Sequence, residues 1–154
     1  MEINGEQVNE KAAYADLKLS PAILRAIEKK GYVMATPVQV GAIPCFMEWK
    51  DVIAKAPTGT GKTFAFGIPM VEHIDPEVPE VQGLVLAPTR ELAVQIQEEL
   101  RDLCAFREGV RTVCLYGGAS IEKQIVALKK RPQIVVATPG RLMDHMKRRT
   151  VRLD

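Results

Sequence analysis

The chain has 154 residues, of which 47% are apolar and 26% charged, the size and composition of one globular domain. This composition excludes a disordered, collagen-like or low-complexity chain, and no apolar stretch approaches the ~20 residues of a membrane-spanning helix. The net charge is only +2, but eight basic residues and a single acid, Asp144, lie between Lys129 and Arg152. Such a segment indicates either a polyanionic partner or a solvated helix end, and charge alone does not choose between them.

The cysteines and the N-terminus predict a cytoplasmic protein without a membrane partner. The three cysteines, Cys45, Cys104 and Cys114, are an odd number with wide spacing, which argues against a disulfide framework and against a zinc site. Free thiols are typical of a reducing compartment. The polar segment from Met1 to Lys11 lacks the apolar core of a signal peptide.

Two helices are predicted in the first third of the chain, after a flexible tail at 1–13. Ser20 and Pro21 have the pattern of an N-cap and first turn, and this helix is expected to end at Gly31. Thr36 and Pro37 begin a second helix in the same way. Gln39, three positions after Thr36, completes a capping-box pattern.

Short aliphatic segments then alternate with helical ones. The aliphatic segments are 52–54, 84–87, 112–116 and 134–137, and the helices after them are expected to begin near Lys62, Thr89, Ser120 and Pro139. This alternation predicts an α/β fold with a mostly parallel sheet flanked by helices on both faces. Because the segments are nearly pure aliphatic, we expect the strands to be buried on both sides.

A glycine-rich loop between the first of these strands and its helix has the pattern of a phosphate-binding loop. Glycines let backbone N–H groups approach phosphate oxygens closely, and the helix start adds further donors. In this pattern the lysine reaches the β- and γ-phosphates, and the threonine hydroxyl is a ligand for Mg²⁺. The residues are Ala56, Pro57, Thr58, Gly59, Thr60, Gly61, Lys62 and Thr63, with alanine where the pattern has its first glycine.

The loop alone predicts only that the protein binds a nucleotide. No Asn-Lys-x-Asp signature of a Ras-type GTPase occurs in the sequence, and neither the His-Arg-Asp nor the Asp-Phe-Gly motif of a protein kinase is present. A small-molecule kinase is harder to separate on this evidence. Gln39 could pair with an adenine edge, but the capping box explains it equally well. Tyr14 could stack on a base, although a packed aromatic near a helix start is the more common case.

Three further loops follow the other predicted strands at their carboxyl ends, where open α/β sheets bind ligands. N–H donors, hydroxyls and guanidinium groups of this kind suit a nucleic-acid backbone. Taken singly, each threonine is more often a helix N-cap and each glycine pair a turn. The residues are Pro88, Thr89 and Arg90, then Gly117 and Gly118, then Thr138, Pro139, Gly140 and Arg141.

Taken together, these motifs resemble the DEAD-box family of ATP-dependent RNA helicases, in the family's order, from Tyr14 to the chain end. Tyr14, Gly31-Tyr32, Thr36-Pro37 and Gln39 resemble its adenine-reading Q motif, although the family usually has phenylalanine at the position of Tyr14. Residues 56–63 resemble motif I, and the three later loops resemble motif Ia, the GG motif (with Gln124 behind it) and motif Ib, which hold the RNA backbone.

The resemblance implies a phosphate-loop, RecA-like helicase domain 1 over residues 14–154, with its Q motif at 14–44 and its loop at 56–63. It further implies ATP and Mg²⁺ as cofactors, sequence-independent contact with the RNA backbone, and unwinding driven by ATP hydrolysis. Lys62 and Thr63 would have the catalytic roles. The RNA substrate is not identified.

The family's Asp-Glu-Ala-Asp carboxylates, which position Mg²⁺ and water, have no counterpart, because the sequence contains no Asp-Glu pair. We therefore expect an incomplete domain from a longer enzyme, with a non-catalytic nucleotide- and RNA-binding regulatory module as the alternative. In this fold two further strands usually lie between the phosphate-loop strand and the others. Without them, we expect the chain to pair with a second copy, exchange elements or reorder its sheet.

The missing carboxylate predicts that residues 1–154 do not hydrolyse ATP in steady state. Phosphate release by the purified chain measures this directly, with Lys62→Ala as the control for a contaminating ATPase. Release that Lys62→Ala abolishes would show the prediction to be wrong.

Overall fold

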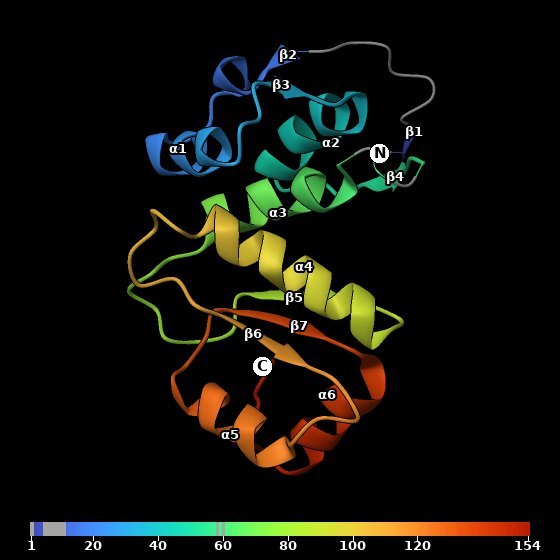
Figure 1. Ribbon diagram of the computed structural model, residues 1–154, viewed down its shortest axis with the longest axis vertical. Coiled ribbons are helices and arrows are strands. Elements are labelled where there is room, and N and C mark those ends of the chain that lie inside the picture. The colour runs from blue at the N-terminus through green and yellow to red at the C-terminus, as the bar shows by residue number, and fades with distance from the viewer. Residues whose placement is uncertain (1, 5–11, 58, 60) are drawn as a thin grey trace. The chain divides into compact units, whose positions relative to one another are not determined.

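The computed structural model describes the backbone of residues 2–4 and residues 12–57, 59 and 61–154 in full (Figure 1). The chain folds into two compact units. The first unit contains Met1–His73 and Asp102–Arg107, and the second contains Ile74–Arg101 and Glu108–Asp154.

The first unit contains three of the predicted helix starts, those at Pro21, Pro37 and Lys62. Its helices are η1 (Tyr14–Leu17), α1 (Pro21–Lys29), α2 (Pro37–Met47) and α3 (Lys62–His73), and its strands are β1 (Glu2–Asn4), β2 (Ala12–Ala13), β3 (Met34–Ala35) and β4 (Ile53–Lys55). The Ser20 hydroxyl accepts a hydrogen bond from the Ile23 N–H at 3.4 Å, as expected for an N-cap. Val38 and Ala42 of α2 pack with Ala65 of α3 in a small buried cluster.

The segment expected to be a flexible tail contains two short strands. Residues 2–4 form β1, which pairs in parallel with β4, and Ala12–Ala13 form β2, which pairs antiparallel with β3. At three and two residues these strands are too short for a local pattern to indicate them, and their pairing depends on partners elsewhere in the chain.

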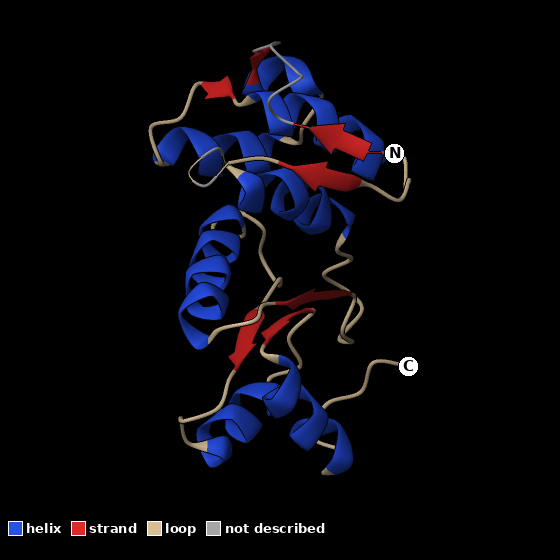
Figure 2. Ribbon diagram, turned by 90° about the vertical axis from the view of Figure 1, so that its right-hand side faces the viewer, coloured by secondary structure: helices blue, strands red, loops and turns tan. Residues whose placement is uncertain are grey.

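The second unit contains a three-stranded parallel sheet in the order β5-β7-β6. Its strands are β5 (Gly83–Leu86), β6 (Thr112–Leu115) and β7 (Ile134–Ala137), and its helices are α4 (Arg90–Leu103), α5 (Ile121–Lys129) and α6 (Pro139–Lys147). The last two residues of α4, after Arg101, are counted with the first unit. The helix α4 lies on one face of the sheet, and α5 and α6 lie on the other (Figures 1 and 2). The α/β class and the parallel sheet flanked by helices are therefore confirmed.

Burial differs among the strands. All four residues of β7 are buried, because β7 has a neighbour on each side and helices over both faces. Leu84 and Leu86 on β5, in contrast, are 37% and 56% exposed, and every residue of β4 is exposed. The expectation of burial on both sides is therefore correct only for the central strand.

The sequence predicts four strands in one sheet, and β4 is the exception. Among the described residues, β4 pairs only with β1, in a two-stranded sheet of its own. An aliphatic segment indicates a strand but does not name its neighbour. The two strands expected between β4 and the others have no counterpart among the described elements, and β1 supplies the hydrogen-bonding partner instead. No helix in the described part of the chain is long and apolar enough to cross a membrane.

Candidate functional site

The glycine-rich loop connects β4 to α3, as predicted. Gly59 and Gly61 have φ values of +82° and +79°, a backbone conformation that L side chains rarely adopt. Lys62 is the first residue of α3 and is exposed, so its ammonium group faces solvent at the helix start. The loop residues Ala56, Pro57 and Thr63 are also described, whereas Thr58 and Thr60 lie outside the described residues.

Gln39 connects α2 to this loop. Its side chain is 2% exposed, and its Nε2 donates to the Gly61 carbonyl oxygen at 3.0 Å. Its Oε1 accepts from the Tyr14 hydroxyl at 2.6 Å and from the Thr36 N–H at 3.0 Å. The second of these bonds is the glutamine half of the capping box, so in this structure the amide both caps α2 and holds the loop.

Tyr14 is 5% exposed, and its hydroxyl donates to Gln39. Burial raises the pKa of the Tyr14 hydroxyl, and the hydrogen bond with Gln39 acts in the opposite direction. Tyr14 therefore orients Gln39 through an oxygen that phenylalanine lacks, while its stacking on a base stays a prediction.

The three predicted backbone-binding loops lie at one edge of the second unit's sheet. The parallel register aligns Leu86 of β5 and Leu115 of β6 with Ala137 of β7, so the loops after these residues leave the sheet side by side. Each loop then begins a helix, and Thr89 caps one of them by accepting from the Leu92 N–H at 3.2 Å. The loop residues are Pro88, Thr89, Arg90, Gly117, Gly118, Thr138, Pro139, Gly140 and Arg141.

Arg90 joins the first two loops. Its guanidinium carbon lies 4.9 Å from the centre of the Tyr116 ring, a cation–π distance. A Cβ added at Gly118, whose φ is +79°, would lie 3.5 Å from Nη1 of Arg90. That distance is an ordinary van der Waals contact, so the positive φ of Gly118, and not crowding by Arg90, is what favours glycine at this turn.

Arg141 joins the second and third loops. Its Nη1 donates to the Ala119 carbonyl oxygen and to Oε1 of Gln124, both at 3.1 Å. Nε2 of Gln124 in turn donates to the Tyr116 carbonyl oxygen at 2.9 Å. Through these bonds one arginine and one glutamine hold the GG loop against the start of α6.

Two residues of this network carry no motif signal in the sequence. Tyr116 lies at the end of an aliphatic segment, and its ring supports Arg90. His145 is fully buried in α6 and bonds to Gln124 and Thr150. Its position three residues after the buried Leu142, on the apolar face of α6, was the available signal for a buried polar group.

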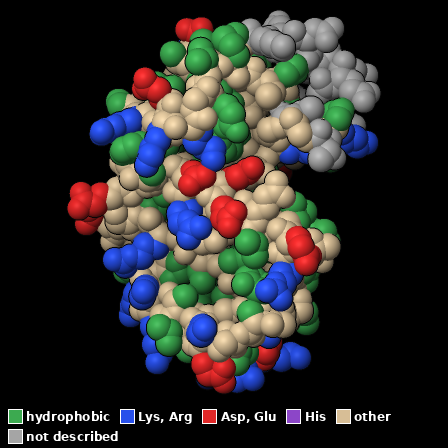
Figure 3. Space-filling model, viewed as in Figure 1, with side chains coloured by type: hydrophobic (Ala, Val, Ile, Leu, Met, Phe, Trp, Pro, Cys, Tyr) green, Lys and Arg blue, Asp and Glu red, His purple; other side chains and the backbone are tan. Residues whose placement is uncertain are grey.

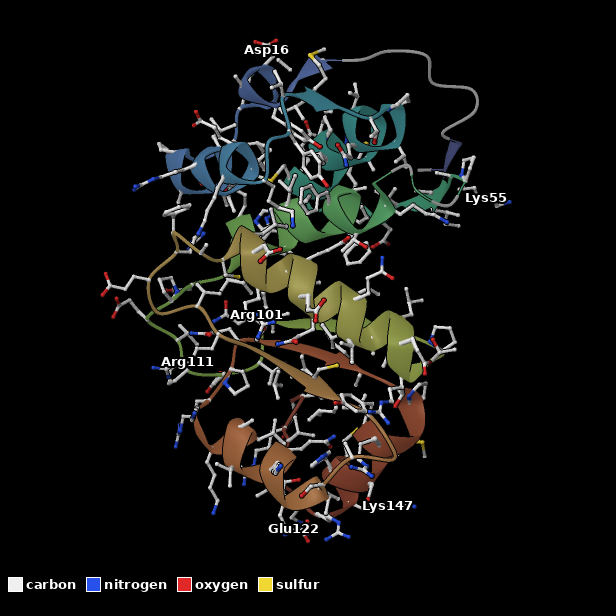
Figure 4. All side chains as sticks on the ribbon, viewed as in Figure 1. Asp16, Lys55, Arg101, Arg111, Glu122 and Lys147 are labelled. Carbon is white, nitrogen blue, oxygen red and sulfur yellow. The ribbon has the colours of Figure 1, made fainter. Side chains whose placement is uncertain are left out.

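Glu122, at the start of α5, lies near positive charge. It has a lowered pKa, mainly because of hydrogen bonds from its own backbone N–H and from Ser120, and the positive charges of Arg148 and Arg141 add to the effect. Glu122 lies in the first turn of α5, whereas Lys147 is the last residue of α6 (Figure 4). On the face shown in Figure 3, Lys and Arg side chains lie among Asp and Glu side chains.

Comparison with known proteins decides the family. Residues 36–154 match the DEAD/DEAH box helicase family. The chain belongs to this family. It is 52% identical over 141 residues to the "ATP-dependent RNA helicase CshA" of Limosilactobacillus reuteri and 51% identical to the "DEAD-box ATP-dependent RNA helicase CshA" of Bacillus subtilis. In both comparisons, 92% of this chain is covered.

Solved structures of this helicase family agree with the fold. The structure of a DEAD box protein from the hyperthermophile Methanococcus jannaschii matches 94% of the chain with a TM-score of 0.84 and 38% identity. That of a hypothetical ATP-dependent RNA helicase from Sulfolobus tokodaii matches 86% with a TM-score of 0.77 and 34% identity. The chain spans 28% of the length of each of the two curated relatives and 38–39% of the two solved chains.

The bond between Gln39 and Gly61 predicts a difference between two glycine substitutions in one loop. A Cβ at Gly61 would lie 2.2 Å from Nε2 of Gln39, whereas a Cβ at Gly59 meets nothing within 4 Å. Both substitutions carry the strain of a positive φ, so Gly59→Ala is a matched control. We expect Gly61→Ala to lower the free energy of unfolding by about 1 kcal/mol more than Gly59→Ala, the net worth of one hydrogen bond.

Urea denaturation of each variant measures this difference. In a Gln39→Ala background the two glycine variants should become equal, because the bond that separates them is gone. Equal destabilisation in the wild-type background would show that the Gln39–Gly61 bond contributes nothing to stability.

Proposed function

We propose that this chain is the nucleotide- and RNA-binding part of an ATP-dependent RNA helicase. The observation that carries the proposal is the direct bond between Gln39 and the Gly61 carbonyl, because it places an amide able to read a base beside a phosphate loop. The alignment of three phosphate-suited loops at one sheet edge supports the RNA half.

The triphosphate would lie against the loop between β4 and α3. Backbone N–H groups of the loop and of the start of α3 would donate to its oxygens, and Lys62 would bind the β- and γ-phosphates. For adenine to pair with Gln39, the amide must exchange bonds that it now makes to Gly61, Tyr14 or Thr36. Base recognition is thereby coupled to the conformation of the phosphate loop.

Mg²⁺ fits this site in part. The Thr63 hydroxyl at the start of α3 is a suitable oxygen ligand, and bound Mg²⁺ would neutralise phosphate charge. Among the described residues, no group of three or more His, Cys, Asp or Glu side chains could hold a metal ion. The other ligands of Mg²⁺ would then be phosphate oxygens of the nucleotide and water molecules.

RNA would lie along the edge formed by the loops after β5, β6 and β7. Loop N–H groups and the threonine hydroxyls would donate to phosphate oxygens, with Arg90 and Arg141 supplying positive charge. These contacts ignore base identity, so binding should be independent of sequence and sensitive to salt. In the whole protein, ATP and RNA binding would together drive duplex unwinding, with hydrolysis releasing the product.

The proposal also covers compartment and assembly. We place the protein in the cytoplasm, because Cys45, Cys104 and Cys114 form no disulfide bond, which is typical of a reducing compartment. Burial raises the pKa of Cys104 and of Cys114 to about 11, which keeps these two thiols protonated. The exposed Leu84 and Leu86 on β5 are the place where a second copy would pair, which sedimentation velocity tests.

Nucleotide preference tests the role of Gln39. We expect Gln39→Ala to reduce the preference for ATP over GTP about five-fold, because one hydrogen bond is worth about 1 kcal/mol. Gln39→Glu separates base reading from helix capping, since a carboxylate still accepts from Thr36 but has no N–H for adenine. Titration of fluorescent ATP and GTP analogues gives both affinities. If neither variant changes the preference, Gln39 does not read the base, and its role is limited to capping α2 and holding the loop at Gly61.

Salt dependence tests the RNA edge. We expect Arg90→Ala and Arg141→Ala each to weaken binding to unrelated RNA sequences, and to reduce the slope of log affinity against log salt by about 0.7. Arg111→Ala is the charge-matched control, because Arg111 precedes β6, at the opposite edge of the sheet, and donates to the Lys130 carbonyl oxygen (Figure 4). Fluorescence anisotropy with two labelled single strands provides the measurement. Equal slopes for all three variants would place RNA elsewhere.

A further inference from the structure

His145 is a buried polar residue with no part in the proposed chemistry. It lies in α6 with its side chain fully buried, and both ring nitrogens have partners. Nε2 lies 2.9 Å from Oε1 of Gln124, and Nδ1 lies 2.8 Å from Oγ1 of Thr150. A buried imidazole held on both sides has one orientation, so it can fix the position of whatever it bonds.

The surrounding hydrogen bonds determine which ring nitrogen carries the proton. Nε2 of Gln124 must face the Tyr116 carbonyl, because a carbonyl oxygen only accepts. Oε1 of Gln124 therefore faces Arg141 and His145, and the guanidinium is consistent with this because it only donates. It follows that Nε2 of His145 carries hydrogen and donates to Gln124.

The charge environment keeps this ring neutral. Burial lowers the pKa of His145, and Arg141 and Arg148 lower it further, while Asp144 acts in the opposite direction. A neutral ring with hydrogen on Nε2 leaves Nδ1 an acceptor, so the single hydroxyl hydrogen of Thr150 has two acceptors within reach, Nδ1 at 2.8 Å and the His145 carbonyl oxygen at 3.1 Å. The imidazole thus supplies one donor to Gln124 without placing a second positive charge beside Arg141.

We propose that His145 is a positioning residue for the RNA-binding edge, acting through Gln124 on the GG loop and on Arg141. Its hydrogen bond fixes the Gln124 amide, whose nitrogen holds the Tyr116 carbonyl just before Gly117. The amide oxygen receives Arg141 at the start of α6. His145 itself touches no RNA. This inference rests on the proposed function for its effect on RNA affinity, but its effect on the loop can be measured without RNA.

Two polar substitutions of similar size separate this role from simple core packing. His145→Gln places an N–H donor near the position of Nε2, whereas His145→Asn places its amide near Nδ1 and cannot reach Gln124. Both leave a polar side chain among the same neighbours. Thermal unfolding of both variants measures the loss of stability that a purely structural role of His145 would produce.

Hydrogen exchange of the backbone amides at 117–119 is the RNA-free measurement, made on the full 154-residue chain. We expect exchange in His145→Asn to be faster than in wild type by about 3- to 10-fold, the range for loss of one hydrogen bond, and His145→Gln to remain near wild type. Equal exchange in the two variants would overturn the inference, whatever the RNA result.

RNA affinity for a labelled oligouridylate is the second measurement. His145→Asn should bind about five-fold more weakly and His145→Gln close to wild type. In an Arg141→Ala background the loss from His145→Asn should shrink, since residues of one network are not additive. If wild type binds and Arg141→Ala weakens binding, but both His145 variants match wild type, the inference fails and the proposed function stands. If wild type does not bind, the proposed function fails, and exchange alone decides the inference.

Discussion

The parallel hydrogen-bond ladder from β7 to β5 and β6 is the constraint on which the proposed RNA-binding edge depends. Parallel strands with matched register end at the same edge, so three loops that are 20 or more residues apart along the chain emerge together. Each loop then begins a helix, whose first N–H groups are unpaired within the helix and suit phosphate. The fully buried β7 makes this arrangement rigid, because a slip in its register would move the buried side chains of both its faces.

Buried glutamines hold individual loops in both units of the chain. Gln39 donates to the carbonyl of Gly61, Gln124 to that of Tyr116, just before the glycine pair, and Gln133 to that of Gly109. The last of these also accepts from the Arg111 N–H at 2.8 Å. A glutamine amide has both a donor and an acceptor, so one side chain can satisfy a loop carbonyl and a second group at once. Glycine loops have few side-chain contacts of their own, and these amides supply the missing restraint.

The sequence predicts local structure well, but it predicts poorly which strands pair and which distant side chains are in contact. Pro21 and Pro37 mark helix starts because proline and the residue before it restrict the backbone locally. By contrast, β4 pairs with β1, and a strand signal contains no information about its neighbour. The family resemblance predicts that Gln39 and Tyr14 contact the base. It does not predict that Tyr14 is buried or that its hydroxyl donates to Gln39. His145 was beyond motif reasoning, because its role arises from its contact with Gln124, 21 residues earlier.

The same internal bonds limit how strongly ligands can bind. The amide of Gln39 and the guanidinium of Arg141 already have partners, so under the proposed function a base or phosphate would replace existing hydrogen bonds and gain only the difference between them. Gln39 or Arg141 alone would therefore add little to the affinity for a ligand. Each exchange of bonds would instead couple ligand binding to the position of a loop. Releasing the Gly61 carbonyl would free the glycine-rich loop, and drawing Arg141 from Gln124 would free the glycine loop that Gln124 also holds. If the chain binds and releases ligands as proposed, release would restore the bonds that binding had broken, so the internal partners of Gln39 and Arg141 would favour turnover of the ligand over tight binding.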